Sequence, residues 1–202
     1  MKKRYTEFYK ESKKVRYIDL PPMIYLTYDG SGNPGESLEF QEGIELLYKF
    51  SYAIRMSYKG DNQIENYETY VVGPLEGIWT TIDELAFDPA NKDNLKFKLL
   101  INQPAFFTID VFHKFKELLL KDNPLMEKIN YEVITEGKAV QILHLGPYDN
   151  EPETLKSVYN DLDEKNLKLL PWTHHEIYLS DNRRTVPEKL RTIVRYQIEE
   201  KS

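Results

Sequence analysis

Residues 174–181 carry the side chains best suited to chemistry, because they alternate polar and apolar types in the order His-His-Glu-Ile-Tyr-Leu-Ser-Asp. Successive side chains of a β-strand point to opposite faces, so His174, Glu176 and Tyr178 share one face, while Ile177 marks the core face. A carboxylate beside a phenol can take a proton from water or pair with a cationic ligand, and the phenol ring offers a stacking surface. We therefore expect this polar face to bind an aromatic or cationic small molecule.

A second segment, residues 144–153, is typical of a strand that ends in a Gly-Pro turn and leads into a helix. Asn150 and Glu153 have the spacing of a capping box, and Pro152 falls in the first helical turn, where a missing N–H costs little. Tyr148, in the turn, is a candidate catalytic residue, either as a hydrogen-bond donor or as a stacking surface. An equally good interpretation is that its hydroxyl only tethers the turn.

No pattern in the sequence predicts a metal ion or a cofactor. His174 and His175 are adjacent, so they face opposite ways in a strand, and no second histidine or acidic cluster supplies further metal ligands. The glycine-rich residues 30–35 lack the Gly-Lys-Ser/Thr ending of a phosphate-binding loop. The chain has no cysteine and no Gly-x-Ser-x-Gly, so a nucleophilic triad has no support either.

The composition argues against several classes of protein. A net charge of −6 and a pI near 5.4 disfavour nucleic acid as a direct partner, since phosphate binding relies on a basic surface. Seven of the first sixteen residues are Lys or Arg, but no helix-turn-helix pattern follows, which favours a solvated arm. The absence of cysteine suggests a cytoplasmic protein, and no apolar run approaches the roughly 18 residues of a membrane span.

An internal repeat predicts the fold class. Residues 22–28 read as a strand, which leads through a Gly-rich turn into an amphipathic helix and then two strands near residues 67–79 and 95–102. The same order of strand, glycine turn, helix and two strands recurs between residues 139 and 198. We therefore predict an α+β fold of two tandem strand-helix-strand-strand modules, related by a pseudo-twofold axis and enclosing a central ligand groove.

The chain as a whole is expected to be a single domain over residues 1–202. Module one spans about residues 20–105 and module two about residues 130–200. An amphipathic helix over residues 109–120, with Phe112 and Phe115 on its apolar stripe, should connect them. The oligomeric state cannot be read from these patterns.

Taken together in order and spacing, five segments resemble the GyrI-like small-molecule-binding family. They are residues 70–79, 99–104, 144–151, 174–181 and 187–195. The resemblance covers nearly the whole chain from about residue 20. It implies two modules around a ligand groove, and it is greatest to a stand-alone branch that hydrolyses cyclopropane-bearing, DNA-alkylating compounds. Thr80 follows Trp79 where many relatives carry a second aromatic residue, which changes one groove wall.

The resemblance also implies roles for the candidate site residues. Glu176 would be the general base and Tyr148 its catalytic partner, while Trp79 would form a flat groove wall. The other expected ligand contacts are Tyr178, His174, Tyr28 and Glu76. Glu76 and Trp79 have the spacing of opposite strand faces, so both reach the groove only if Gly77 forms a bulge.

Three functions remain open at this point. The first is a hydrolase that opens the cyclopropane ring of electrophilic genotoxins by adding water. The second is a non-catalytic binder of hydrophobic aromatic drugs or cations, which sequesters them or signals to a protein partner. The third, inhibition of DNA gyrase, is suggested only by the family name. The hydrolase is favoured because no DNA-binding segment is attached.

Overall fold

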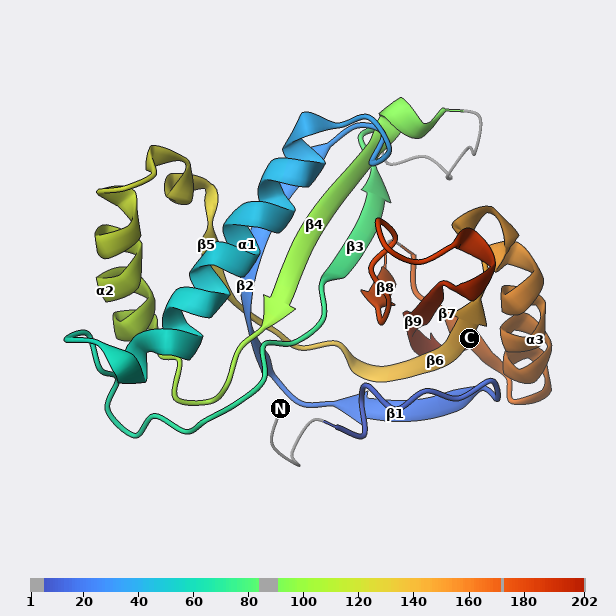
Figure 1. The fold of residues 1–202 in the computed structure, drawn as a ribbon. Helices are drawn as coiled ribbons and strands as arrows, with labels where there is room; N and C mark the ends of the chain where they lie inside the picture. Colours follow the sequence, from blue (N-terminus) through green and yellow to red (C-terminus); the bar gives the residue numbers. More distant parts are fainter. Residues whose placement is uncertain (1–5, 84–90, 172, 202) are drawn as a thin grey trace.

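The computed structural model describes residues 6–83, 91–171 and 173–201, and within these residues three α-helices and nine β-strands form an α+β fold (Figure 1). The module-one elements are β2 (Met23–Ser31), α1 (Leu38–Met56), β3 (Glu76–Thr81) and β4 (Leu95–Asn102). The module-two elements are β6 (Gly137–Leu145), α3 (Glu151–Glu164), β8 (His174–Tyr178) and β9 (Arg191–Glu200). The remaining elements are β1 (Arg16–Leu20), α2 (Ile109–Leu120), β5 (Asn130–Ile134) and β7 (Leu167–Leu169).

Both halves have the predicted element order and the same strand pairing. The strands run β2-β4-β3 in module one and β6-β9-β8 in module two, with all pairs antiparallel. The flanking strands are exchanged between the halves, since β1 pairs with β6 and β5 pairs with β2. The α+β fold predicted from the repeat is therefore confirmed.

The modules meet in a way that the sequence did not indicate. β3 and β8 pair antiparallel, so the two halves join edge to edge in one curled sheet, and not only through packing of their bare faces. On the face opposite the helices, an apolar cluster with residues from both modules packs inside the curl of the sheet. Its buried members are Phe8, Leu20, Met23, Tyr25, Leu100 and Ala139.

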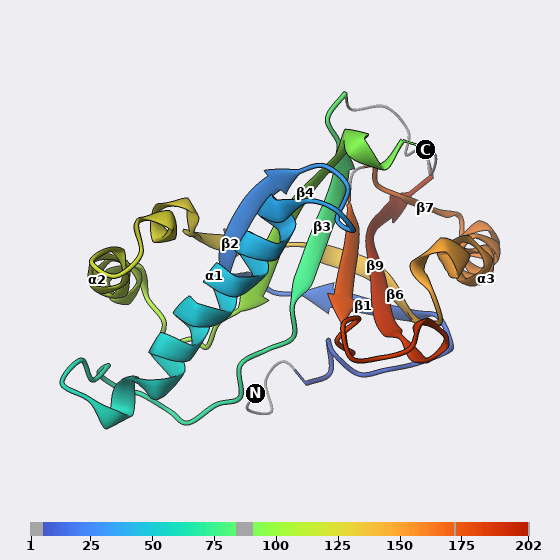
Figure 2. The same ribbon diagram turned by 45° about the horizontal axis from the view of Figure 1, so that its top comes forward.

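Helices α1 and α3 pack against the same face of the sheet. The side chain of Ser37 caps α1 by accepting a hydrogen bond from the backbone N–H of Phe40, and Leu47, Phe50 and Ile54 on its inner stripe are fully buried. Helix α3 packs on module two through Leu155, Val158 and Leu162, which are buried in one cluster with residues of β6 and β9. Figures 1 and 2 show α1 beside the strands of module one and α3 beside those of module two, with β3 and β8 between them.

Helix α2 has the predicted bounds and buries Phe112 and Phe115. It packs on module one, where Phe112 stacks on Phe50 with ring centroids 5.5 Å apart. No described helix is both long enough and apolar enough to cross a membrane.

Several local predictions are wrong. Of the strand expected over residues 67–79, only residues 76–79 pair in the sheet, as part of β3. The side chain of Asn150 makes no capping hydrogen bond, so the capping box does not form, although Pro152 lies in the first turn as predicted. The N-terminal segment is not a solvated arm throughout, because Phe8 is buried and the Tyr9 hydroxyl donates to Glu76. Residues 1–5 of that segment lie outside the described residues.

Candidate functional site

A cavity of about 1440 Å³ lies between the two modules on the helix side of the sheet. Its lining residues come from β3 and β8, which form the floor, and from α1 and the first turn of α3, which form walls. Figure 2 shows α1 and α3 on either side of β3 and β8. Its volume exceeds the roughly 300–1,000 Å³ typical of small-molecule sites, so a polycyclic ligand fits. The aromatic lining residues are Phe40, Tyr48, Tyr52, Trp79, Tyr148, Tyr178 and Tyr196.

The pairing of β3 with β8 decides which side chains face this cavity. The register sets Gly77 opposite Glu176 and Trp79 opposite His174. Residues directly opposite in an antiparallel pair point to the same face. His174, Glu176 and Tyr178 line the cavity together, and Ile177 is fully buried on the other face. The alternation in the sequence thus predicted the faces of His174, Glu176, Tyr178 and Ile177.

Trp79 and Tyr178 form one rigid aromatic wall. The Trp79 indole Nε1 donates a hydrogen bond to the Tyr178 hydroxyl at 2.9 Å, and the indole stacks on Phe40 with ring centroids 5.8 Å apart. A Cβ atom on Gly77 would lie 3.0 Å from Trp79 Nε1 and 3.1 Å from the Tyr178 hydroxyl oxygen. Glycine at this position therefore allows the two rings to meet above the strand.

Tyr148 reaches the cavity from the short 3₁₀ turn Tyr148–Asn150 that precedes α3. Its ring meets the Tyr178 ring edge to face, with centroids 6.0 Å apart. Burial and the neighbouring charge of Glu176 raise the pKa of Tyr148 to about 12. The hydroxyl therefore keeps its proton at neutral pH and can serve as a hydrogen-bond donor.

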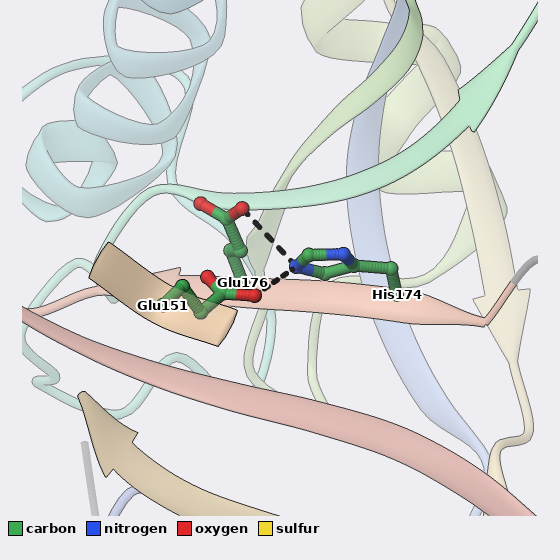
Figure 3. Close-up of side chains that lie close together, drawn as sticks. All are labelled: Glu151, His174 and Glu176. Atoms are coloured by element: carbon green, nitrogen blue, oxygen red, sulfur yellow. Dashed lines mark ion pairs between the residues drawn. The ribbon is translucent and has the colours of Figure 1, made fainter. Parts of the chain in front are cut away.

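Three side chains converge at one end of the floor. His174 Nε2 lies 3.2 Å from the nearest Glu176 carboxylate oxygen and 3.3 Å from that of Glu151 (Figure 3). The Tyr196 hydroxyl contacts the other ring nitrogen, Nδ1, at 3.1 Å. Figure 3 shows both carboxylates on the Nε2 side of the imidazole, so His174 lies between two acids. We call Glu151, His174 and Glu176 the groove triad.

The electrostatics of the groove triad raise the pKa of two of its members, His174 and Glu151. Burial alone would lower the pKa of His174, but the contact with Glu176 and the charge of Glu151 outweigh burial and raise it. Burial raises the pKa of Glu151 to about 7, and the charge of Glu176 acts in the same direction while His174 opposes it. Two carboxylates that share one imidazolium in a poorly hydrated site do not both ionise readily.

The groove triad could also hold a metal ion, since its three ligand atoms all lie within 4.8 Å of one another. Sequence reasoning missed Glu151, because it reads as an ordinary acidic residue in the first turn of a helix. The one signal that could have found it is its position. A strand that ends beside the groove and is followed by a short turn can direct the first helical side chain back toward the floor.

Two predicted ligand contacts lie outside the cavity. β3 pairs regularly with both neighbours and has no bulge at Gly77, so Glu76 points away from Trp79 and is fully buried on the opposite face of the sheet. Tyr28 is buried beneath α1, where its ring packs against Gly43 and its hydroxyl donates to Glu42 at 2.8 Å. The placement of both residues in the groove is therefore corrected.

Glu76 belongs to a buried ionic network behind the floor, which we call the back network. The two ring nitrogens of His175 contact Glu136 at 2.8 Å and Glu76 at 2.9 Å. Arg195 donates to Glu136 at 2.8 Å, and the Tyr9 hydroxyl donates to Glu76 at 2.6 Å. Burial opposes a charged imidazole, but Glu136 and Glu76 raise the pKa of His175 to about 9. These contacts tie both modules and the N-terminal segment together.

The sequence profile of the GyrI-like small-molecule-binding domain matches residues 13–198. The chain belongs to this family. No curated protein matches the chain.

Several solved structures resemble this GyrI-like domain. An uncharacterised conserved protein from Listeria innocua is 33% identical, with a TM-score of 0.89 over 98% of both chains. A protein from the same organism, described as a hydrolase encoded by lin2189, is 32% identical, with a TM-score of 0.89 over 98% of both chains. The EcmrR C-terminal domain, 11% identical with a TM-score of 0.52 over 93% of this chain and 98% of that one, shares the fold alone.

Proposed function

We propose that this GyrI-like domain is a hydrolase that opens the cyclopropane ring of electrophilic aromatic compounds by adding water, with Glu176 as the general base. The observation that carries the proposal is the Glu176 carboxylate on the floor of a large aromatic-lined cavity. The similar Listeria innocua protein that is described as a hydrolase supports a hydrolytic enzyme, without indicating the substrate. Such an enzyme would detoxify DNA-alkylating compounds in the cytoplasm without touching nucleic acid.

The chemistry needs few groups. A cyclopropane conjugated to a carbonyl is strained, and attack by water opens the ring once negative charge can collect on the carbonyl oxygen. The enzyme must supply a base beside the water, a donor near that oxygen and flat walls that hold the substrate. Glu176 is the base in this proposal, and Tyr148, which stays protonated, is a donor. Trp79 and Tyr178 are the flat walls.

The alternative is a non-catalytic binder of aromatic cations, which would make the protein a multidrug-sequestering one. A carboxylate among aromatic rings is the arrangement that binds organic cations. In this groove, however, His174 lies 3.2 Å from Glu176 and its raised pKa favours the imidazolium form. The carboxylate already has a counter-ion, so the groove suits a neutral electrophile better than a cation.

Incubation with a duocarmycin-type cyclopropane compound tests the proposal. Mass spectrometry of the small molecule should show the gain of one water with wild-type protein, and a much slower gain with Glu176→Gln. Glu153→Gln is a matched control, because Glu153 is exposed on α3 and pairs with Lys156 at 2.7 Å. Binding without any gain of water would support a non-catalytic binder instead.

A further inference from the structure

Glu151 is a carboxyl group that the ring-opening scheme above does not use. It is the first residue of α3, and its side chain is only 8% exposed although it lines the cavity. A carboxylate at a helix N-terminus is normally stabilised in its ionised form by the helix dipole. Here burial outweighs that effect, because the side chain turns inward against β8 and not outward to solvent.

We propose that Glu151 is a second catalytic residue, the general acid that protonates the oxygen of the substrate, and that His174 carries protons between Glu151 and Glu176. The inference rests on the proposed hydrolase function. It is drawn from the geometry of the groove triad, in which His174 Nε2 faces both carboxylates at 3.2 and 3.3 Å.

The protons balance over one turnover. Water attacks the ring carbon, a C–O bond forms, and the ring C–C bond breaks so that its electron pair moves into the conjugated carbonyl. Glu176 takes one proton from the water, and Glu151 gives one to the carbonyl oxygen, which stays bonded to its carbon and becomes an enol or phenol hydroxyl group. The proton on Glu176 then returns to Glu151 through His174 Nε2. The net reaction is the addition of one water.

The contacts of His174 suit this carrier role. Its Nε2 is enclosed, and its two carboxylate contacts are ion pairs that lack the alignment of full hydrogen bonds. A proton on Nε2 is therefore not held in a hydrogen bond to either carboxylate. At the other side of the ring, the Tyr196 hydroxyl contacts Nδ1 at 3.1 Å and fixes the orientation of the imidazole.

Glu151 also has the protonation state that a general acid needs. Burial raises the pKa of Glu151 above the ordinary value of a carboxyl group, which is the direction that a general acid near neutral pH requires. The charged or titratable groups that act on Glu151 are His174 and Glu176 on β8 and Tyr196 on β9. Tyr178 on β8, and Tyr148 and Asp149 in the turn before α3, line the same cavity. The exposed Asp149 carboxylate is paired with Lys92 at 3.2 Å.

Glu151→Gln keeps the size of the side chain and removes the acid. We expect turnover of the cyclopropane compound to fall by about 10²–10⁴, the range for a single general acid or base. Wild-type turnover should decline as the pH rises through about 7, where Glu151 loses its proton, and the residual activity of Glu151→Gln should lack that decline. Glu153→Gln should keep both the turnover and the decline.

A measurement without substrate separates this inference from the proposed function. Infrared difference spectra of wild-type protein between about pH 6 and pH 8 should show a carboxylic acid losing its proton, and Glu151→Gln should lack that band. The inference fails, and the proposed function stands, if Glu176→Gln is inactive while Glu151→Gln is active. It also fails if the alkaline decline persists in Glu151→Gln and disappears in His174→Gln. Activity lost on dialysis against EDTA and restored by Zn²⁺ would overturn it, because the triad would then be a metal site.

Discussion

His174 and His175 are neighbours on one strand, yet they lie in opposite kinds of environment. His175 faces the back network, where both ring nitrogens meet carboxylates at 2.8 and 2.9 Å and nothing opens to solvent. His174 faces the cavity, where its side chain is 28% exposed and one nitrogen is shared loosely between two acids. A buried side chain with every polar atom paired stabilises the fold, whereas a partly exposed side chain with loose contacts remains available to a ligand.

The two faces of β8 therefore have different roles, one structural and one in the site. The back network fixes β8 against β3 and so sets the positions of Glu176 and Trp79 across the floor. The groove triad keeps its capacity to move protons because it is not locked in this way. Substitutions in the back network should therefore reduce stability, whereas substitutions in the groove should reduce turnover or binding.

The largest effect on stability is expected from His175→Gln. Loss of the imidazolium leaves Glu76 and Glu136 buried with less compensating charge, and breaking a buried ion pair costs roughly 3–5 kcal/mol. His174→Gln should cost less, because Nε2 makes no aligned hydrogen bond to either carboxylate and Glu151 can take up a proton when the imidazolium is removed. Urea unfolding of the two variants measures the difference. Equal losses would mean that the two faces do not differ as described.

The pH dependence of stability should show the back network directly. Burial opposes ionisation of Glu136, but His175 and Arg195 lower its pKa to about 2, so its contribution is present above the unfolded value of about 4.3 and is lost as the pH falls toward 2. The pKa of His175 is raised to about 9, so its contribution is complete below about 6.5 and is lost as the pH rises through 9.

Thermal unfolding across this range should therefore show stability falling at both ends, apart from the other titrating groups. In His175→Gln the loss between about pH 6.5 and 9 should be smaller than in the wild-type protein. An unchanged alkaline loss in that variant would show that His175 is not charged in the folded protein.

The smallest of these effects concerns the groove wall. Trp79→Ala should weaken binding of an aromatic ligand by roughly 1–3 kcal/mol, because the indole is a partly buried anchor stacked on Phe40. Addition of a rhodamine or tetraphenylphosphonium should change tryptophan fluorescence, and Trp79→Phe should abolish the change. The other tryptophan, Trp172, lies outside the described residues. A response that survives Trp79→Phe would place the wall elsewhere.

Much of this arrangement could be predicted from local patterns. Strand alternation gave the faces of His174, Glu176 and Tyr178, because a side-chain period of two needs no knowledge of distant contacts. The repeat gave the element order of both modules. The opposite faces of Glu76 and Trp79 also followed from strand parity, and the error lay in assuming a bulge at Gly77.

What depended on pairing over long distances could not be predicted. The β3–β8 junction joins residues about a hundred positions apart, so nothing local reveals that it forms the groove floor. Glu151 becomes part of the site only when α3 folds back against β8. Tyr28 has a residue type suited to a ligand site, but α1 covers it, and only the close approach at Gly43 shows this.

The most direct test of the central claim is the turnover of a cyclopropane compound by Glu176→Gln. The amide keeps the shape of the side chain and removes the base, so turnover should fall by about 10²–10⁴ while binding of the neutral substrate changes little. Urea stability should stay close to that of the wild-type protein, since Glu176 lies outside the back network. Wild-type turnover that survives the substitution would remove Glu176 from the mechanism and contradict the account.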